Sequence, residues 1–220
     1  MFNIFGFYKF KKLNNLKKLK NRLENNLKDY EIRGTIIISP EGVNGTISDK
    51  KNNLLKFNKL LKKILSIKKF NSENNSNSKF NPFHKLKIKI KKEVVPMGFK
   101  VRNYNFPKNN LNPREWNKII KKKDTVLIDA RKSFEYDVGT FKNSINPNIE
   151  NFREFPKYLN QFKNSENIAM FCTGGIRCEK ANIYLKKKGF KNVYVLKGGI
   201  INYLNNINKK NSQWNGECFV

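Results

Sequence analysis

In the first part of the chain, segments rich in β-forming residues alternate with segments whose hydrophobic residues have helical spacing. The runs NIFGFYKF and EIRGTIIISP are rich in β-forming residues, and EGVNGTISD combines a turn with a further strand. Apolar residues recur every three or four positions within residues 11–30 and 50–67, which predicts two helices. HKLKIKIKKEVV alternates lysine with apolar residues, which predicts a strand with one face in water. This order, β-α-β-β-α-β, is that of a ferredoxin-like α+β domain over residues 1–95.

Two segments lack such a pattern. NSENNSNS, from Asn71 to Ser78, contains no residue that would fill a core, so we expect a loop there. A second segment begins with Pro96 and Gly98 and stays rich in Asn and Pro as far as Pro113, which indicates a linker between two domains. We place this linker over residues 96–121.

After the linker the chain changes to short, continuous apolar runs. TVLIDA, NIAMFC and NVYVL are runs of this kind, which are typical of strands buried on both faces in parallel sheets. The helix-like segment ANIYLKKKGF separates the last two of them. This alternation predicts an α/β domain with a mostly parallel sheet over residues 122–206, followed by a tail over residues 207–220.

Basic residues greatly outnumber acidic ones. There are 46 Lys and Arg against 17 Asp and Glu, which gives a formal net charge of +29 and favours a polyanionic partner such as nucleic acid. Of the 46, however, 39 are lysine, and Asn, Ile and Phe are also abundant. AT-rich coding favours this set of residues, so mutational drift on solvated faces competes as an explanation. Charge sets affinity rather than sequence preference and does not identify the partner.

Several classes of protein are excluded or disfavoured by the sequence. It has no run of about 18 apolar residues, and its first residues place apolar positions before charges, the reverse of a secretory signal. We therefore expect a cytoplasmic protein with no membrane partner. Three cysteines are too few for a disulfide framework. His84 is the single histidine and is expected to pack at the start of a strand, so we predict no metal site.

Cys172 ends an apolar strand and begins a glycine-rich turn. In open α/β sheets, ligands bind at the carboxyl ends of strands, where helix N-termini present free N–H groups. The three residues after Cys172 have little bulk, so successive N–H groups can surround one anion or a terminal persulfide sulfur. A thiol in this position should have a lowered pKa and be a thiolate near neutral pH. The expected active-site loop is Cys172, Thr173, Gly174, Gly175, Ile176 and Arg177.

Other interpretations of this loop compete. Cys172 could be a small hydrophobe that ends a strand, although Arg177 and a helix start directly after it favour a functional role. Cys178 either packs against the sheet, which we favour, or resolves an oxidised Cys172. Cysteine-dependent phosphatases place arginine six positions after the cysteine, whereas here it is five. We reject that class, because the shorter loop leaves too little room for a phosphate dianion.

A second polar constellation lies in LIDARKSFEYDVGTF. Asp129 and Arg131 directly follow a strand, and Glu135 and Gly139 continue at loop spacing. Aspartate at a strand end usually orders a neighbouring loop, so we interpret this segment mainly as scaffold. Arg131 is the member expected to reach the Cys172 pocket.

These motifs together resemble a known family. DAR…EYDVGTF, CTGGIRCEKA and GFKNVYVLKGGI resemble a rhodanese homology domain. With RGTIIISPEGVNGTIS and PFHKLKIKIKKEVV upstream, the chain resembles the rhodanese-like tRNA uridine hydroxylases from Phe5 to about Tyr203. The resemblance implies formation of 5-hydroxyuridine at the wobble position of tRNA. It also implies dioxygen as co-substrate and an unidentified reductant, while the sequence shows no cofactor motif and indicates no protein partner.

The resemblance assigns roles to single residues as well. Cys172 matches the active-site cysteine, a candidate persulfide carrier, and Arg177 and Cys178 match the family motif. Family members usually continue past the counterpart of WNGECFV into a Cys-rich tail, so at Val220 either the tail has been lost by reduction or the chain is incomplete. A sulfurtransferase, or a non-catalytic RNA-binding protein with a relic rhodanese domain, remain the alternatives. The N-terminal domain favours the hydroxylase.

Overall fold

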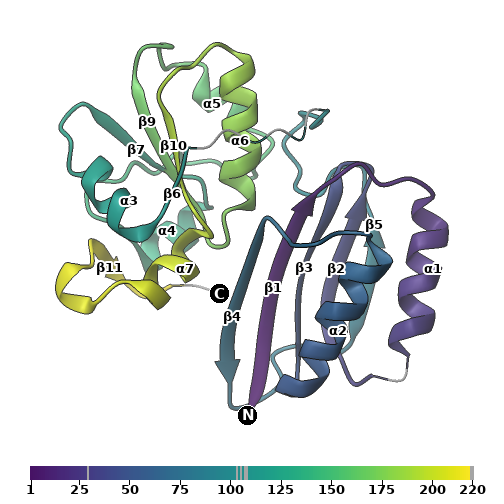
Figure 1. The fold of residues 1–220 in the computed structure, drawn as a ribbon. Coiled ribbons are helices and arrows are strands. Elements are labelled where there is room, and N and C mark those ends of the chain that lie inside the picture. Colours follow the sequence, from purple (N-terminus) through teal and green to yellow (C-terminus); the bar gives the residue numbers. More distant parts are fainter. Residues whose placement is uncertain (29, 103, 105, 107–108, 219–220) are drawn as a thin grey trace. The chain divides into compact units, whose positions relative to one another are not determined.

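The chain forms two compact units, Met1–Val95 and Pro96–Val220, each with its own sheet and core (Figure 1). The computed structural model describes residues 1–28, 30–102, 104, 106 and 109–218. Within these residues no helix combines the length and the apolar character needed to cross a membrane.

The first unit is a five-stranded sheet with two helices. Its elements are β1 (Phe2–Phe10), α1 (Leu16–Leu27), β2 (Arg33–Ser39), β3 (Gly42–Asp49), α2 (Lys51–Ile64), β4 (Ser72–Ser78) and β5 (Leu86–Ile90). The strand order is β4-β1-β3-β2-β5, in which only the β2–β5 pair is parallel. The first four strands and two helices have the ferredoxin-like arrangement, which confirms the predicted fold class.

The strand that completes this arrangement was assigned wrongly from the sequence. Asn71–Ser78 was predicted to be a loop, but Ser72–Ser78 forms β4 and pairs antiparallel with β1 from Tyr8↔Ser72 to Phe2↔Ser78. HKLKIKIKKEVV instead supplies β5, an additional edge strand beside β2. Ser and Asn have low strand propensity, and backbone pairing along the edge of β1 determines the conformation here.

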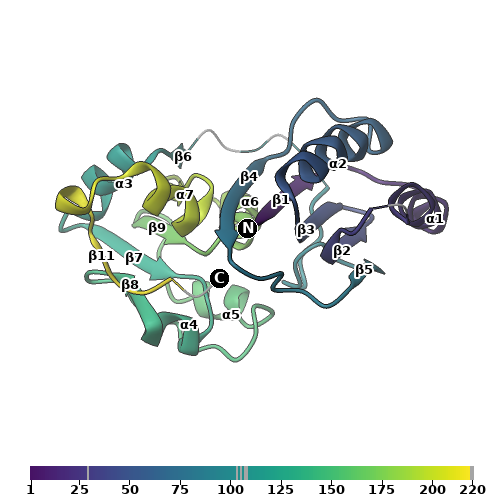
Figure 2. The ribbon, with the colours of Figure 1, turned by 90° about the horizontal axis from the view of Figure 1, so that it is seen from below.

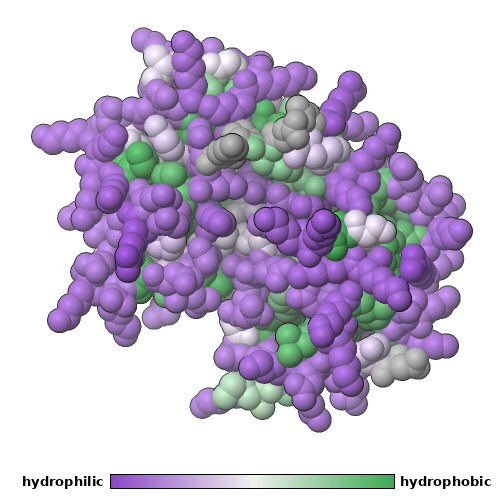
Figure 3. Space-filling view, viewed as in Figure 1, coloured by the Kyte–Doolittle hydropathy of each residue, from purple (hydrophilic) through white to green (hydrophobic). Residues whose placement is uncertain are grey.

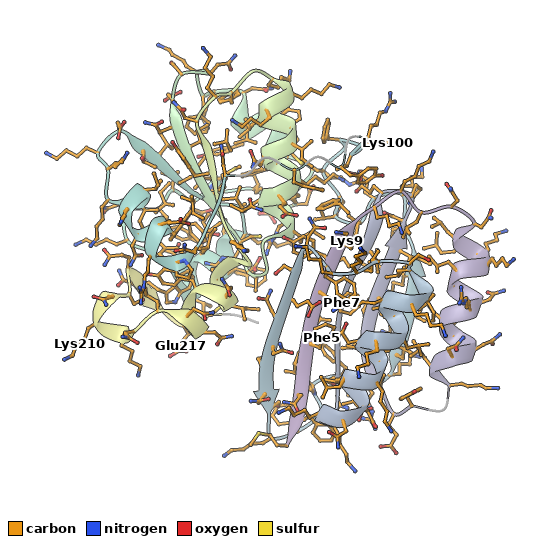
Figure 4. All side chains as sticks on the ribbon, in the orientation of Figure 1. Phe5, Phe7, Lys9, Lys100, Lys210 and Glu217 are labelled. Atoms are coloured by element: carbon orange, nitrogen blue, oxygen red, sulfur yellow. The ribbon has the colours of Figure 1, made fainter. Side chains whose placement is uncertain are left out.

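Both helices of the first unit cover the same face of its sheet, as Figure 2 shows from below. Alternation along β1 directs Phe5 and Phe7, labelled in Figure 4, toward this face, where their rings stack with centroids 5.3 Å apart. Leu23 of α1 and Phe57 of α2 are fully buried against them. The predicted helical spacing therefore marks the residues that close this core.

The second unit is built around a parallel sheet of order β6-β10-β9-β7. TVLIDA and NIAMFC pair in parallel from Thr125↔Asn167 to Asp129↔Phe171, which confirms the predicted α/β architecture. A separate antiparallel pair joins β8 and β11, which lie side by side in Figure 2. The elements are β6 (Asn110–Leu111), α3 (Pro113–Ile120), β7 (Thr125–Asp129), α4 (Ser133–Val138), β8 (Gly139–Phe141), α5 (Phe155–Leu159), β9 (Asn167–Phe171), α6 (Ile176–Lys187), β10 (Val193–Leu196), α7 (Gly199–Asn206), the 3₁₀ turn η1 (Lys209–Asn211) and β11 (Trp214–Gly216).

The linker predicted over residues 96–121 extends too far. β6 pairs with β10 and α3 packs into the second core, with Trp116 fully buried. Asn112 and Pro113, interpreted as linker residues, are the N-cap and first residue of α3: the Asn112 side chain accepts hydrogen bonds from the N–H groups of Arg114 and Glu115. Asn112 and Pro113 were interpreted as the end of regular structure, but here they begin a helix.

The segment predicted as a tail, residues 207–220, also contributes to the fold. β11 pairs with β8, and Trp214 packs edge-on against Phe141 with ring centroids 5.2 Å apart. Phe141 also contacts Phe171 at 4.8 Å and Tyr203 at 4.7 Å. One aromatic cluster thus joins β8, β9, α7 and β11 beneath the end of the sheet.

Candidate active site

The loop after β9 surrounds the Cys172 sulfur with backbone donors. Cys172 and Thr173 follow the strand, Gly174 and Gly175 complete the turn, and α6 begins at Ile176. Gly175 has a φ of 98°, in the left-handed region that favours glycine. Its N–H donates to Cys172 Sγ at 3.2 Å. The predicted loop therefore places its cysteine beside the N-terminus of a helix, where a negative charge such as a thiolate is stabilised.

The first turn of α7 holds the other side of this loop. The N–H groups of Ile200 and Ile201 donate to the carbonyl oxygens of Cys172 and Thr173, at 3.0 and 3.2 Å. Gly199 has a φ of +67°, and a Cβ atom there would lie 2.4 Å from both carbonyl oxygens. The second glycine in YVLKGGI, Gly199, is therefore required so that α7 can approach the loop backbone and fix it.

Arg177 is held by a carboxylate from α4. Its guanidinium donates to both oxygens of Glu135, each at 3.1 Å, and to Thr173 Oγ1 at 3.2 Å. Thr173 Oγ1 in turn donates to Glu135 Oε1 at 3.2 Å. A bidentate pair of this kind fixes the plane of the guanidinium as well as its distance. The three side chains form a closed polar triangle on the rim of the Cys172 loop.

The two cysteines of the loop differ sharply in acidity. Burial raises the pKa of Cys172, but the Cys178 thiol, the charge of Arg177 and the N–H groups of Cys178 and Gly175 outweigh burial and lower it to about 6. Burial, together with the neighbouring Cys172, raises the pKa of Cys178 well above its usual value. At pH 7 Cys172 is therefore the thiolate and Cys178 a thiol that hydrogen-bonds to it.

Arg131 does not take the place that the sequence suggested for it. Its guanidinium is fully buried and donates to both oxygens of Asp129, at 2.9 and 2.7 Å, and to the carbonyl oxygen of Gly139. It lies over the ring of Trp214, 5.2 Å from the centroid. Arg131 thus ties β7, β8 and β11 together, and within the described residues its side-chain hydrogen bonds go to Asp129 and Gly139.

Glu135 is the residue that sequence reasoning undervalued. Its carboxylate accepts a hydrogen bond from the backbone N–H of Lys132 at 3.1 Å, so it also caps α4. The hydrogen bonds and charge of Arg177 outweigh the effect of burial and lower the pKa of Glu135. A glutamate at the third position of a helix usually indicates only a capping box. Its second role, holding Arg177, depends on the fold, because the two residues are 42 positions apart in the sequence.

Other candidates lie outside this site. His84 is exposed just before β5 in the first unit, so the expectation that it packs at the start of a strand is wrong. Cys218 is partly buried, and burial raises its pKa. Among the residues that the structure describes, no three His, Cys, Asp or Glu side chains gather closely enough to hold a metal ion.

Comparison with known proteins gives both units a family. Residues 2–94 match the UPF0176 acylphosphatase-like domain, and residues 112–206 match the rhodanese-like domain. The tRNA uridine(34) hydroxylase of Pelagibacter ubique is 64% identical over 220 residues, which cover all of this chain and 73% of that protein. This chain belongs to the tRNA uridine(34) hydroxylase family. The hydroxylase of Legionella pneumophila strain Corby is 42% identical, with 99% of this chain and 87% of that protein covered.

Among solved structures, a rhodanese-related protein from Thermoplasma volcanium is 25% identical to the chain. The match covers 44% of this chain and 91% of that protein, with a TM-score of 0.38.

Proposed function

We propose that this chain converts uridine 34 of tRNA to 5-hydroxyuridine in the cytoplasm, with Cys172 as its catalytic nucleophile. The observation that carries the proposal is the 64% identity, over the whole chain, with a protein named as a tRNA uridine(34) hydroxylase. The site supports it, because Cys172 is a thiolate at neutral pH beside a fixed guanidinium. Such a thiolate is a strong nucleophile.

The chemistry of uracil indicates what a thiolate can do there. The C5–C6 double bond is conjugated with the C4 carbonyl, so a thiolate adds at C6 and leaves an enolate with electron density at C5. Carbon C5 then bonds to one end of dioxygen and, with a proton, forms a hydroperoxide. Two electrons from the reductant and two protons cleave its O–O bond, which leaves C5–OH and releases water. Loss of the C5 proton and departure of the Cys172 sulfur restore the double bond. In this scheme Arg177 stabilises the thiolate before attack and after release.

The balance of the reaction defines its co-substrates. One oxygen atom of dioxygen enters the C5–OH group, and the other leaves as water. The reduction consumes two electrons and two protons, which a separate reductant supplies. Dioxygen and a reductant are therefore part of the proposal, with tRNA as the partner.

The proposal is tested in a strain that lacks the gene. Complementation with the wild type should restore 5-hydroxyuridine in tRNA, measured by nucleoside mass spectrometry. Cys172→Ser should abolish it, because a serine hydroxyl stays protonated near pH 7. Cys218→Ser is the matched control and should keep it. Normal 5-hydroxyuridine with Cys172→Ser would overturn the role of Cys172, and none with the wild type would overturn the function.

Addition at C6 has a test of its own. Without dioxygen, reversible addition should exchange the hydrogen at C5 of uridine 34 with solvent, so tRNA incubated with the protein in heavy water should gain one deuterium there. Cys172→Ser should show no exchange. Hydroxylation in air without anaerobic exchange would show that the thiolate acts in another way.

A further inference from the structure

A polar pocket lies on the second unit, between α3, the end of α7 and the segment that leads to β11. It has a volume of about 340 Å³. Figure 1 shows these elements together, and Lys210 is labelled in Figure 4. The lining residues are Arg114, Asn117, Lys121, Asn206, Ile207, Asn208, Lys210, Asn211 and Gln213.

The pocket has a floor that is fixed by hydrogen bonds. The hydroxyl of the fully buried Tyr203 donates to Asn117 Oδ1 at 2.8 Å and accepts from the backbone N–H of Gln213 at 2.9 Å. Asn117 Nδ2 donates to the carbonyl oxygen of Asn211 at 2.8 Å. These bonds join α3, α7 and the segment after α7, so the pocket wall is held in place from three sides.

The lining of the pocket has a strong chemical bias. It consists of five side-chain amides, three cations and one isoleucine, with no carboxylate. Within the described part of the chain, no ion pair engages Arg114, Lys121 or Lys210. Pockets for drug-sized ligands are mostly apolar, whereas Arg, Lys, Asn and Gln side chains are the usual contacts of nucleic-acid phosphates. The lining therefore fits a phosphate group and does not fit an apolar molecule.

The pocket is linked to the Cys172 loop by a single helix. α7 begins where Ile200 donates to the Cys172 carbonyl, and its last residue, Asn206, lines the pocket. Eight helical residues at 1.5 Å each span about 12 Å. One strand of RNA can extend over such a distance.

We propose that this pocket binds a backbone phosphate of the RNA substrate, at a nucleotide other than the one that enters the Cys172 loop. That the ligand is RNA rests on the proposed function. That the pocket takes a phosphate group rests on its lining alone. Phosphate contacts position a nucleic acid without reading its sequence. The pocket would thus set the register in which the target uridine meets Cys172.

The test measures tRNA affinity of the full chain at several salt concentrations. In the pocket variant, Arg114, Lys121 and Lys210 are all replaced by Ala. In the matched control, Lys157, Lys163 and Lys191 are replaced by Ala; these exposed lysines of the same unit do not line the pocket. The pocket variant should bind about tenfold more weakly near physiological salt, and its plot of log affinity against log salt should be shallower by about 1 or more.

The outcomes separate the pocket from the function. Equal losses in the two variants would overturn the proposal, because the three pocket cations would then act only as general surface charge. No loss in either variant would overturn it as well. Since binding is measured without turnover, a wild type that binds through the pocket but forms no 5-hydroxyuridine would refute only the proposed function. Lys210→Glu provides a single change on an exposed side chain and should weaken binding more than Lys163→Glu.

Discussion

At the scale of single residues, the site separates into a part that the sequence reveals and a part that only the fold reveals. Cys172 to Arg177 are contiguous, so their small side chains and the following helix start could be interpreted from local rules. Glu135 contacts Arg177 and Thr173 from another element. No local rule links positions so far apart, and the same glutamate has a sufficient local explanation as a helix cap.

The acidity of Cys172 gives the first prediction. Because the thiolate is the reactive form and the pKa is about 6, alkylation of Cys172 by iodoacetamide should rise as pH increases through 6 and reach a plateau above about 7. Cys178 should react slowly over this range, since its pKa is raised. Peptide mass spectrometry after timed labelling measures both rates. Equal rates at pH 7 would contradict the assignment of Cys172 as the thiolate.

Glu135 gives the second prediction, as a positioning residue. Glu135→Gln keeps the length of the side chain but removes its charge and replaces one acceptor oxygen by an NH₂ donor. At most one of the two hydrogen bonds from Arg177 can then remain, so the guanidinium should be held less firmly near the Cys172 sulfur. The midpoint of Cys172 alkylation should then rise above pH 6, with 5-hydroxyuridine formation reduced about tenfold. Glu150→Gln, at an exposed acid of the same unit, is the control. An unchanged midpoint would indicate that Glu135 serves only as a cap.

At the scale of elements, the strands that carry apolar runs were predicted correctly, whereas β4, which has no apolar residue, was predicted to be a loop. β7, β9 and β10 are buried on both faces, so their composition alone reveals them. β4 consists of Ser, Glu and Asn and owes its conformation to pairing with β1. α3 was missed for a different reason, because Asn112 and Pro113 signal a turn and a helix start equally well.

The start of α7 gives the third prediction. Gly199→Ala combines a left-handed backbone with a Cβ atom 2.4 Å from two loop carbonyls, so it should cost at least about 2 kcal/mol of stability and slow Cys172 alkylation. Gly98→Ala is a matched control, since Gly98 has a φ of +73° and no atom within 4 Å of the added Cβ. It should cost only about 1 kcal/mol. Equal costs in denaturant unfolding would show that α7 does not hold the loop.

At the scale of the whole molecule, charge is the dominant property. Hydrophilic residues cover most of the face shown in Figure 3, in keeping with a net charge of +29. The sequence correctly indicated the family and both kinds of sheet, because the two domains carry separate patterns. It did not reveal the pocket that Arg114, Lys121 and Lys210 line, since α3 and the segment after α7, which holds Lys210, come together only in the fold.

The charge gives the fourth prediction. Binding of tRNA should weaken at least about a hundredfold between 50 and 200 mM salt, because each neutralised phosphate releases counterions. Filter binding or fluorescence anisotropy at four salt concentrations measures the slope. Binding that is flat across this range would mean that the lysines are ordinary solvated surface.

The buried guanidinium of Arg131 has a consequence for which basic residues of the chain can be exchanged. Seven of the 46 basic residues are arginine, and a guanidinium that bonds Asp129 through two nitrogens has no equivalent in an ammonium group. The shape of arginine is needed at Arg131 and Arg177, whose guanidinium groups each bond a carboxylate through two nitrogens. In a library that exchanges every arginine for lysine, these two positions should reject the exchange while exposed Arg22 accepts it.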